Sequence, residues 1–252
     1  MKMINGDVFK TTVEEDLKEI ASDECILIKG RKNEMNLEKS GKRVKAHIRY
    51  LNESGKQVPG VTTFIGVLNK PALIPWANNL GLEGINVKDY VNDKADIGTL
   101  AHAMIFSHLK KEEPDLSLYS QKQIDLAENS FLKYLGWEKK HTLKSILLEA
   151  PLVSEKYQYG GTVDNFCILD DVVTLLDYKT SKAIYTEAHI QVSAYRNLLK
   201  ENRKEELKEC AILRIGRDES EGFDFIKCSN LDKYFQIFLH CVGIYNLKKE
   251  VK

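Results

Sequence analysis

The sequence has few cysteines, and no two of them lie close together in the chain. Its 252 residues contain five, with no C-x-x-C pair. An odd count in a chain without a recognisable secretory signal favours reduced thiols over a disulfide framework. The tight spacings that bind zinc or an iron–sulfur cluster are also missing, and we expect neither. The five are Cys25, Cys167, Cys210, Cys228 and Cys241.

Long apolar segments are absent as well. No run of 18 apolar residues occurs, so we expect no membrane-spanning helix and no membrane partner. Residues 1–24 carry acids throughout and lack the apolar stretch of a secretory signal. The expected location is therefore the cytoplasm.

The sequence also lacks an excess of positive charge. Lys plus Arg number 37 and Asp plus Glu number 37, which gives a formal net charge of zero. A protein that only coats nucleic acid usually carries a basic excess, because neutralising phosphates supplies most of its affinity. The balance disfavours passive coating but says little against an enzyme whose acids gather at one site. No G-x-x-x-x-G-K-[S/T] motif occurs, so the chain carries no P-loop motor of its own.

The first quarter of the chain is expected to be a lead-in or small subdomain, over residues 1–58. It contains a predicted helix at 12–21, a strand with period-2 alternation at 43–50 and a turn at 52–56. The remaining residues, 59–252, are expected to form the main domain. Two short helical stretches, at 61–68 and 72–80, begin it.

The centre of the chain predicts an α/β domain with a mixed sheet flanked by helices. Residues 94–110 have helical periodicity, with an apolar side made by Ile97, Leu100, Ala101, Met104 and Ile105. Three strands are predicted at 145–153, 161–169 and 172–178, and the Asp170-Asp171 turn joins the last two in a hairpin. Further helices are predicted at 120–135, 187–201 and 231–248, with strands at 211–215 and 223–228. This order is neither all-β nor a regular βαβ repeat.

An acid and a base stand two residues apart at the end of an apolar strand, in Asp177-Tyr178-Lys179. Because strand side chains alternate, Asp177 and Lys179 point to one face and Tyr178 to the other. Unpaired charges are costly to bury, so the presence of two charged residues at the end of an apolar strand requires an explanation. An ion pair at a strand end explains it as well as a reactive site does.

A second acid changes that balance. The two-residue turn pairs Leu169 with Val172, and counting back from it places Asp164 opposite Asp177. Two carboxylates about 5 Å apart repel each other unless a cation lies between them. A hard divalent cation such as Mg²⁺ prefers carboxylate oxygens and retains water for exchange. The alternative is that one aspartate faces solvent.

Four motifs in order resemble a known family. Gly161-Thr-Val-Asp164 followed by Asp177-Tyr178-Lys179 resembles the split acid and D-x-K core of the PD-(D/E)xK nuclease superfamily. Gly98-Thr-Leu-Ala-His102 and Gln191-Val-Ser-Ala-Tyr195 look like the G-x-x-x-H and Q-x-x-x-Y helices of its RecB-like branch. The match covers roughly residues 94–200. Residues 58–64 and 70–76 also look like the lead-in of phage-encoded and mitochondrial genome-maintenance members.

The resemblance implies a restriction-endonuclease-like core and a role for each matched residue. Lys179 would be the catalytic lysine, while His102, Asp164, Asp177 and the backbone carbonyl of Tyr178 would hold the metal. Glu149 matches an acid often found upstream, as a ligand of a second metal or a support for the first. An exposed acid at a strand edge is an equal alternative for it. Gln191 would orient Lys179 or a ligand, and the substrate-binding candidates are Tyr195, Lys182 and Arg196.

The implied function is hydrolysis of DNA phosphodiesters with one or two Mg²⁺ or Mn²⁺ ions, by an exonuclease of recombination, repair or phage DNA processing. The alternatives are a structure-specific or flap endonuclease with the same site, and a DNA-binding subunit that does not cut. Single- or double-stranded DNA is the expected partner, with a helicase or recombination protein as a further one. The cell would be a bacterium or a phage-infected host. Cys210, Cys228 and Cys241 are too widely spaced for the relatives that hold an iron–sulfur cluster.

Overall fold

The structure is a computed structural model that describes residues 49–203 and 206–251. The helix predicted at 12–21, all but the end of the strand predicted at 43–50, and Cys25 lie outside the described residues. The proposed boundary at residue 58 remains a prediction.

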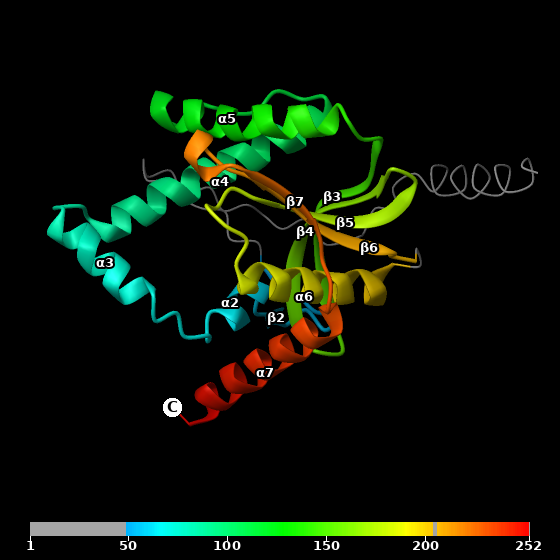
Figure 1. Cartoon of the computed structure of the whole chain (residues 1–252). Helices are drawn as coiled ribbons and strands as arrows, with labels where there is room; N and C mark the ends of the chain where they lie inside the picture. The colour runs from blue at the N-terminus through cyan, green and yellow to red at the C-terminus, as the bar shows by residue number, and fades with distance from the viewer. Residues whose placement is uncertain (1–48, 204–205, 252) are drawn as a thin grey trace, which may run out of the picture. The chain divides into compact units, whose positions relative to one another are not determined.

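A five-stranded mixed sheet forms the centre of the described chain (Figure 1), in the order β3-β4-β5-β6-β7. All neighbours are antiparallel except β5 and β6, which are parallel. Helix α6 makes the crossover that a parallel pair requires. The strands are β3 (Leu143–Ser154), β4 (Tyr159–Leu169), β5 (Val172–Lys179), β6 (Glu209–Ile215) and β7 (Phe223–Lys227).

The predicted hairpin of β4 and β5 is confirmed. Asp170 and Asp171 both have positive φ, 49° and 65°, as a two-residue turn that matches the strand twist requires. Pairing follows the counted register from Leu169–Val172 to Asn165–Leu176. The expected next pair, Asp164 with Asp177, is absent from this ladder, and the strand pairing ends one step before it.

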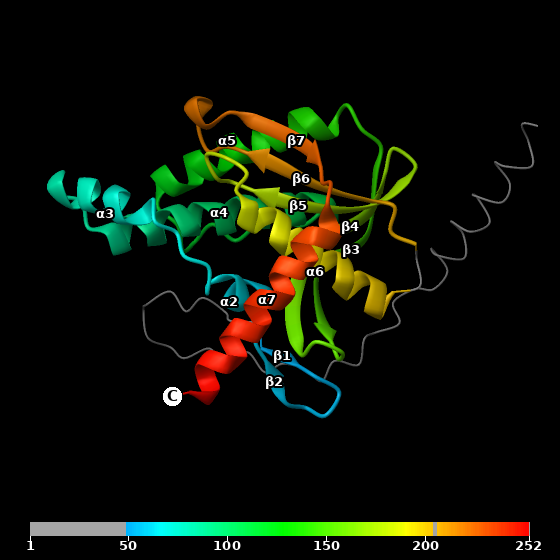
Figure 2. The ribbon, with the colours of Figure 1, turned by 60° about the horizontal axis from the view of Figure 1, so that its bottom comes forward.

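Helices cover both faces of the sheet (Figures 1 and 2). Helices α4 (Val87–Lys110) and α5 (Gln121–Glu138) lie on one face, and α6 (Thr186–Asn202) and α7 (Leu231–Glu250) on the other. This confirms the α/β class and the mixed sheet flanked by helices, the arrangement expected of a restriction-endonuclease-like core. The five apolar residues predicted along α4 are all buried. The helix begins seven residues before the expected start, where Asn86 caps it by accepting from the backbone N–H groups of Lys88 and Asp89.

Three smaller features precede α4. A hairpin of β1 (Tyr50–Leu51) and β2 (Gln57–Val58) carries the predicted turn and contacts β3 and β4. Helix α2 (Val61–Ile65) buries Val61, Phe64 and Ile65 against α6 and α7. Helix α3 (Leu73–Leu82) has no buried residue. Within the described residues, no helix is both long and apolar enough to cross a membrane.

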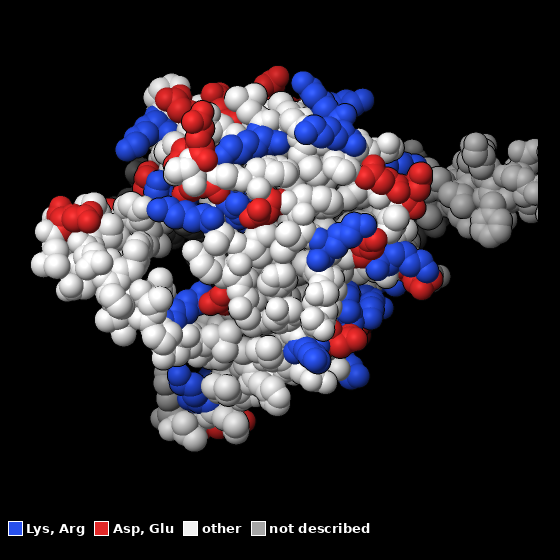
Figure 3. All heavy atoms as spheres, in the orientation of Figure 1, with Lys and Arg blue, Asp and Glu red and all other residues white. Residues whose placement is uncertain are grey.

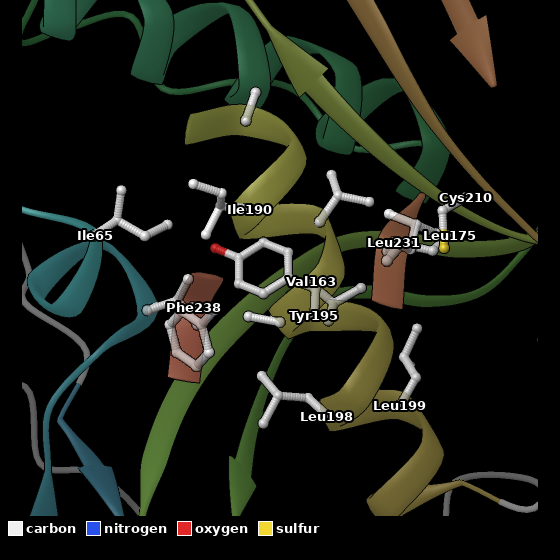
Figure 4. Packing of buried hydrophobic residues seen from close by; sticks show 14 of the residues in the cluster. Ile65, Val163, Leu175, Ile190, Tyr195, Leu198, Leu199, Cys210, Leu231 and Phe238 are labelled. Atoms are coloured by element: carbon white, nitrogen blue, oxygen red, sulfur yellow. The ribbon is translucent and has the colours of Figure 1, made fainter. Parts of the chain in front are cut away.

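Close packing between α6 and the sheet depends on a glycine. Tyr195 of α6 lies among apolar side chains from α2, β4 and α7 (Figure 4). A Cβ atom added to Gly161 of β4 would lie 2.6 Å from Cε1 of Tyr195 and 3.0 Å from Cδ1 of Leu198. The absent side chain at residue 161 therefore lets the Tyr195 ring lie directly on the strand.

We expect Gly161→Ala to lower the free energy of unfolding by about 1–3 kcal/mol, because overpacking this contact displaces a buried ring. Gly136→Ala is the matched control. Gly136 is in the exposed part of α5, and nothing lies within 4 Å of an added Cβ there. Alanine should stabilise that helix by roughly 0.5–1 kcal/mol. Urea unfolding measures both, and effects of the same sign would contradict the packing account.

Candidate active site

Asp177 and Lys179 form an ion pair at the end of β5. The Lys179 Nζ atom lies 2.5 Å from Oδ2 of Asp177, as their shared strand face predicts. Asp177 is fully buried, with a side chain only 1% exposed, whereas the Lys179 side chain is 22% exposed. One end of the pair thus lies in the interior and the other reaches the surface.

Asp164 occupies the point where β4 and β5 separate. Its Oδ2 atom accepts a hydrogen bond of 2.9 Å from the backbone N–H of Tyr178, so a side chain takes the place of a strand carbonyl. On its other side, pairing with β3 passes from Leu148–Asn165 to Ala150–Val163 and omits Asp164. The expectation that Asp164 and Asp177 face each other as a regular cross-strand pair is therefore wrong. The strands part there, and Asp164 bridges them through the Tyr178 backbone.

His102 reaches the same place from α4. Its Nδ1 atom lies 3.9 Å from Oδ2 of Asp164, and its ring centroid is 6.0 Å from that of Tyr178. Gly98, one turn earlier, permits this approach: a Cβ there would lie 2.8 Å from Oγ1 of Thr180, just beyond β5. Gly98 thus allows α4 to lie against the strand end, as its place in the motif predicts.

Burial sets the protonation of these groups. It raises the pKa of Asp177 to about 6, where Lys179 opposes the shift and Asp164 adds to it. Burial, together with repulsion from Lys179, lowers the pKa of His102 to about 4. At neutral pH the imidazole is therefore uncharged, which is the form that binds metals. Burial alone would lower the pKa of Lys179, but attraction to Asp177 and Asp164 outweighs it and raises that pKa.

The donor atoms fit a hard cation in their chemistry, although they do not enclose one as they lie. In the described part of the chain, no three His, Cys, Asp or Glu side chains are grouped closely enough to hold a metal ion. Oδ1 of Asp177, however, is buried there without a hydrogen-bond partner. A buried oxygen left unsatisfied is costly, and a divalent cation is a partner that carboxylates prefer. Asp164 and His102 are the neighbouring donors.

Comparison with known proteins adds little to this geometry. No protein-family model and no curated protein matches the sequence. Among solved structures, the chain is similar to one from Eubacterium rectale that is named as a candidate exonuclease. The two share 14% identity with a TM-score of 0.40, over 60% of this chain and 65% of the other. A likeness of this degree carries no conclusion about activity.

Gln191 and Tyr195 lie one turn apart on α6, and the Gln191 side chain donates a hydrogen bond of 2.7 Å to the Tyr195 hydroxyl. Burial raises the pKa of Tyr195, and the charges of Asp164 and Asp177 raise it further. The pair therefore lies beside the acids, with the tyrosine inside the core and the glutamine nearer the surface.

Of the other predicted residues, Glu149 and Lys182 are exposed and Arg196 is half-buried. Glu149 has a positive φ of 47° on the edge strand β3 and pairs with Lys110 at 3.1 Å. The negative charge of Glu149 acts on both neighbours: it opposes part of the lowering of the His102 pKa and adds to the raising of the Asp164 pKa. Lys182 is exposed in the loop after β5. Arg196 forms an ion pair with Asp232 of α7, so part of its charge is already used.

A cleft of about 330 Å³ opens beside Lys179. Gln191, Tyr185 and Glu187 line it from the start of α6, and Lys70 lines it from the segment after α2. The motifs indicated only Lys179 and Gln191 here. Lys70 belongs to the lead-in stretch noted in the sequence, whereas nothing in the local pattern indicates Tyr185.

Sequence reasoning also missed the support behind Tyr178. Its hydroxyl accepts a hydrogen bond of 3.0 Å from the Asn165 side chain, which follows Asp164 directly. The ring packs edge-on against Tyr134 of α5, whose hydroxyl donates to Glu138 at 2.8 Å. These contacts fix the strand between Asp177 and Lys179 from the opposite face of the sheet.

We expect Gly98→Ala to lower the free energy of unfolding by about 1 kcal/mol net, because the new methyl group would overlap the Thr180 hydroxyl while alanine's higher helix propensity offsets part of that cost. Thr180→Ala removes the atom that it meets. The double variant should therefore lose less stability than the two single changes added together, which denaturant unfolding of all four proteins measures. Additive losses would mean that α4 and the end of β5 are not in the contact described.

Proposed function

We propose that this chain is a metal-dependent nuclease that hydrolyses DNA phosphodiesters, with Asp164, Asp177 and Lys179 at its active centre. The observation that supports this most is the convergence of one buried acid, one half-buried acid, one lysine and one neutral histidine where β4 and β5 part, next to an open cleft. The order of the motifs, which resembles the RecB-like PD-(D/E)xK branch, supports the same reading.

Each side chain would have a definite task. Asp177 and Asp164 would supply carboxylate oxygens, His102 a ring nitrogen and Tyr178 its backbone carbonyl, as ligands for Mg²⁺ or Mn²⁺. A bound divalent ion would polarise the phosphate and lower the pKa of an attacking water. Lys179 would orient that water and offset the negative charge that develops on the phosphorus centre. Gln191 would hold Lys179 in place from the α6 side of the cleft.

The remaining predicted residues would contribute less. Lys182, which is exposed in the loop after β5, would contact a phosphate of the bound strand and take no part in the chemical step. Arg196 would have to leave Asp232 to do so. Tyr195 would act through Gln191, because its hydroxyl is already hydrogen-bonded to that side chain. Glu149, coupled to His102 and Asp164 by its charge, would hold a second ion or tune the first.

The proposed mode of cutting is exonucleolytic, because exonucleases are common in the family that the motifs resemble. A structure-specific or flap endonuclease would use the same centre, and circular DNA distinguishes the two, because only an endonuclease cuts it. A DNA-binding subunit that does not cut is the alternative of another class. The proposed partners are DNA and, for unwinding, a separate helicase.

We expect Lys179→Ala to reduce kcat by about 10²–10³, the usual cost of losing one preorganised electrostatic contact. DNA affinity measured without metal should stay close to that of the unaltered protein. Lys182→Ala, three residues later in the loop after β5, is the control: it should weaken binding, and reduce the slope of affinity against salt by roughly one unit, with kcat nearly unchanged. If the unaltered protein shows no metal-dependent cleavage and Lys179→Ala only weakens binding, the non-cutting subunit is the better account.

We also expect Mn²⁺ to bind at Asp177, with Asp164 and His102 beside it. Anomalous scattering from crystals soaked in Mn²⁺ locates the ion, and calorimetry measures its affinity. Asp177→Asn should abolish binding and cleavage together, because it removes the charged ligand while keeping the shape of the side chain. Asp125→Asn, on the exposed side of α5, is a control that should leave both unchanged. An ion elsewhere would overturn the site assignment.

A further inference from the structure

The cleft beside Lys179 is built from two segments that are far apart in the sequence. Thr62, Ile65 and Lys70 come from α2 and the segment after it, and Tyr185, Glu187 and Gln191 from the start of α6. Helix α2 lies alongside this end of α6 (Figure 1). Because Lys179 is also part of the wall, whatever fills the cleft lies directly next to the candidate cutting centre.

The size of the cleft limits its occupant. Ligand sites usually have volumes of roughly 300–1,000 Å³, and about 330 Å³ lies at the lower end of that range. One nucleotide fits such a space, whereas a base pair with both backbones is far too large. On the face shown in Figure 3, acidic and basic side chains of the described residues alternate around an uncharged area. No continuous basic band for a duplex backbone is seen on that face.

Tyr185 offers an aromatic surface at the rim. Its side chain is 57% exposed although it lines the cleft, and Ile65 and Ala188 provide apolar walls near it. Every nucleic-acid base has a flat π-face, and stacking on an aromatic ring contributes without regard to which base it is. An exposed tyrosine in a cleft that apolar side chains and Lys179 also line therefore suits an unstacked base.

Two of the charged residues that line the cleft, Lys70 and Glu187, form an ion pair with each other. Lys70 Nζ lies 3.0 Å from Oε1 of Glu187, with side chains 45% and 28% exposed. A phosphate would be attracted to Lys70 and repelled by Glu187. The carboxylate would instead accept a hydrogen bond from an amino group on a base edge. To contact a phosphate and a base edge at once, Lys70 and Glu187 would first have to separate, and both side chains are partly exposed.

We propose that this cleft holds one unpaired nucleotide next to the cut phosphate, with its base stacked on Tyr185 and its outer phosphate on Lys70. The proposal rests on the nuclease function proposed above and narrows its substrate to a single-stranded end or a frayed duplex end. In a fully paired duplex the base would first have to leave the stack, which costs a few kcal/mol.

Binding without metal tests the stacking. Fluorescence anisotropy in EDTA, with the full chain and a labelled single strand, should show Tyr185→Ala binding about 5- to 150-fold more weakly, the range of one base–aromatic stack. Tyr185→Phe keeps the ring and should bind like the unaltered protein. Phe223→Ala, which removes a 40% exposed ring from β7 outside the cleft, is the control and should change nothing. Equal losses for the Ala and Phe variants at residue 185 would overturn the stacking role.

A second experiment identifies which base of the strand stacks on Tyr185. In a set of strands of equal length, each with one abasic position, a single position should weaken binding as much as Tyr185→Ala does. At that position, Tyr185→Ala should add no further loss, because both changes remove the same contact. Additive losses at every position would overturn the proposal. Lys70→Ala should lower the salt slope by roughly one unit, whereas Lys144→Ala, exposed at the other end of the sheet, should not.

The two proposals fail separately. Coupling between Tyr185 and one base, in a protein that does not cut with Mg²⁺ or Mn²⁺, would remove the nuclease function and leave a single-strand binding site. Metal-dependent cleavage without that coupling would leave the nuclease and remove the subsite. Absence of any DNA binding would overturn both.

Discussion

The separation of β4 from β5 is the constraint on which the candidate site depends. The hairpin pairs regularly as far as Asn165 and Leu176, and there the Asp164 carboxylate accepts the next backbone N–H in place of a strand carbonyl. A regular ladder would have held the carbonyls and amides of both strands in hydrogen bonds. Where the strands part, Asp164 reaches the end of β5, next to Asp177 and Lys179.

Such an opening requires support from both faces of the sheet. On one face, Tyr178 is held by Asn165 and by the aromatic packing of α5, while α4 approaches closely at Gly98. On the other face, Gly161 allows the Tyr195 ring to lie against β4. Glycine therefore occurs where helix and strand must come closest, and bulky aromatic residues fill the space around those contacts. Asp177 is buried within this packing, and its partner Lys179 extends from it toward the surface.

The cleft joins this rigid centre to the surface. Its walls come from α2 and α6, so its shape depends on how the segment before the core packs on the helix that follows it. An exposed aromatic ring, Tyr185, and the Lys70–Glu187 ion pair are among the groups that an occupant of this cleft would meet. A nuclease built on this plan would read the state of its substrate, paired or unpaired, through one pocket rather than through a broad basic surface, which agrees with a net charge of zero.

Most of the fold follows from local patterns in the sequence. The apolar run of β5, the Asp170-Asp171 turn and the helical periodicity of α4 each determine an element, because turn geometry and the two side-chain periods act over a few residues. The same patterns indicated that Asp177 and Lys179 share a face and that Asp164 lies near them, whereas His102 was grouped with these residues only by the resemblance of its motif to a known family. Local patterns could not indicate that β4 leaves β5 at Asp164, since that break depends on β3 and α4 packed around it. Nor could they bring Lys70 and Tyr185 together: more than a hundred residues separate them, and only the packing of α2 on α6 makes them neighbours.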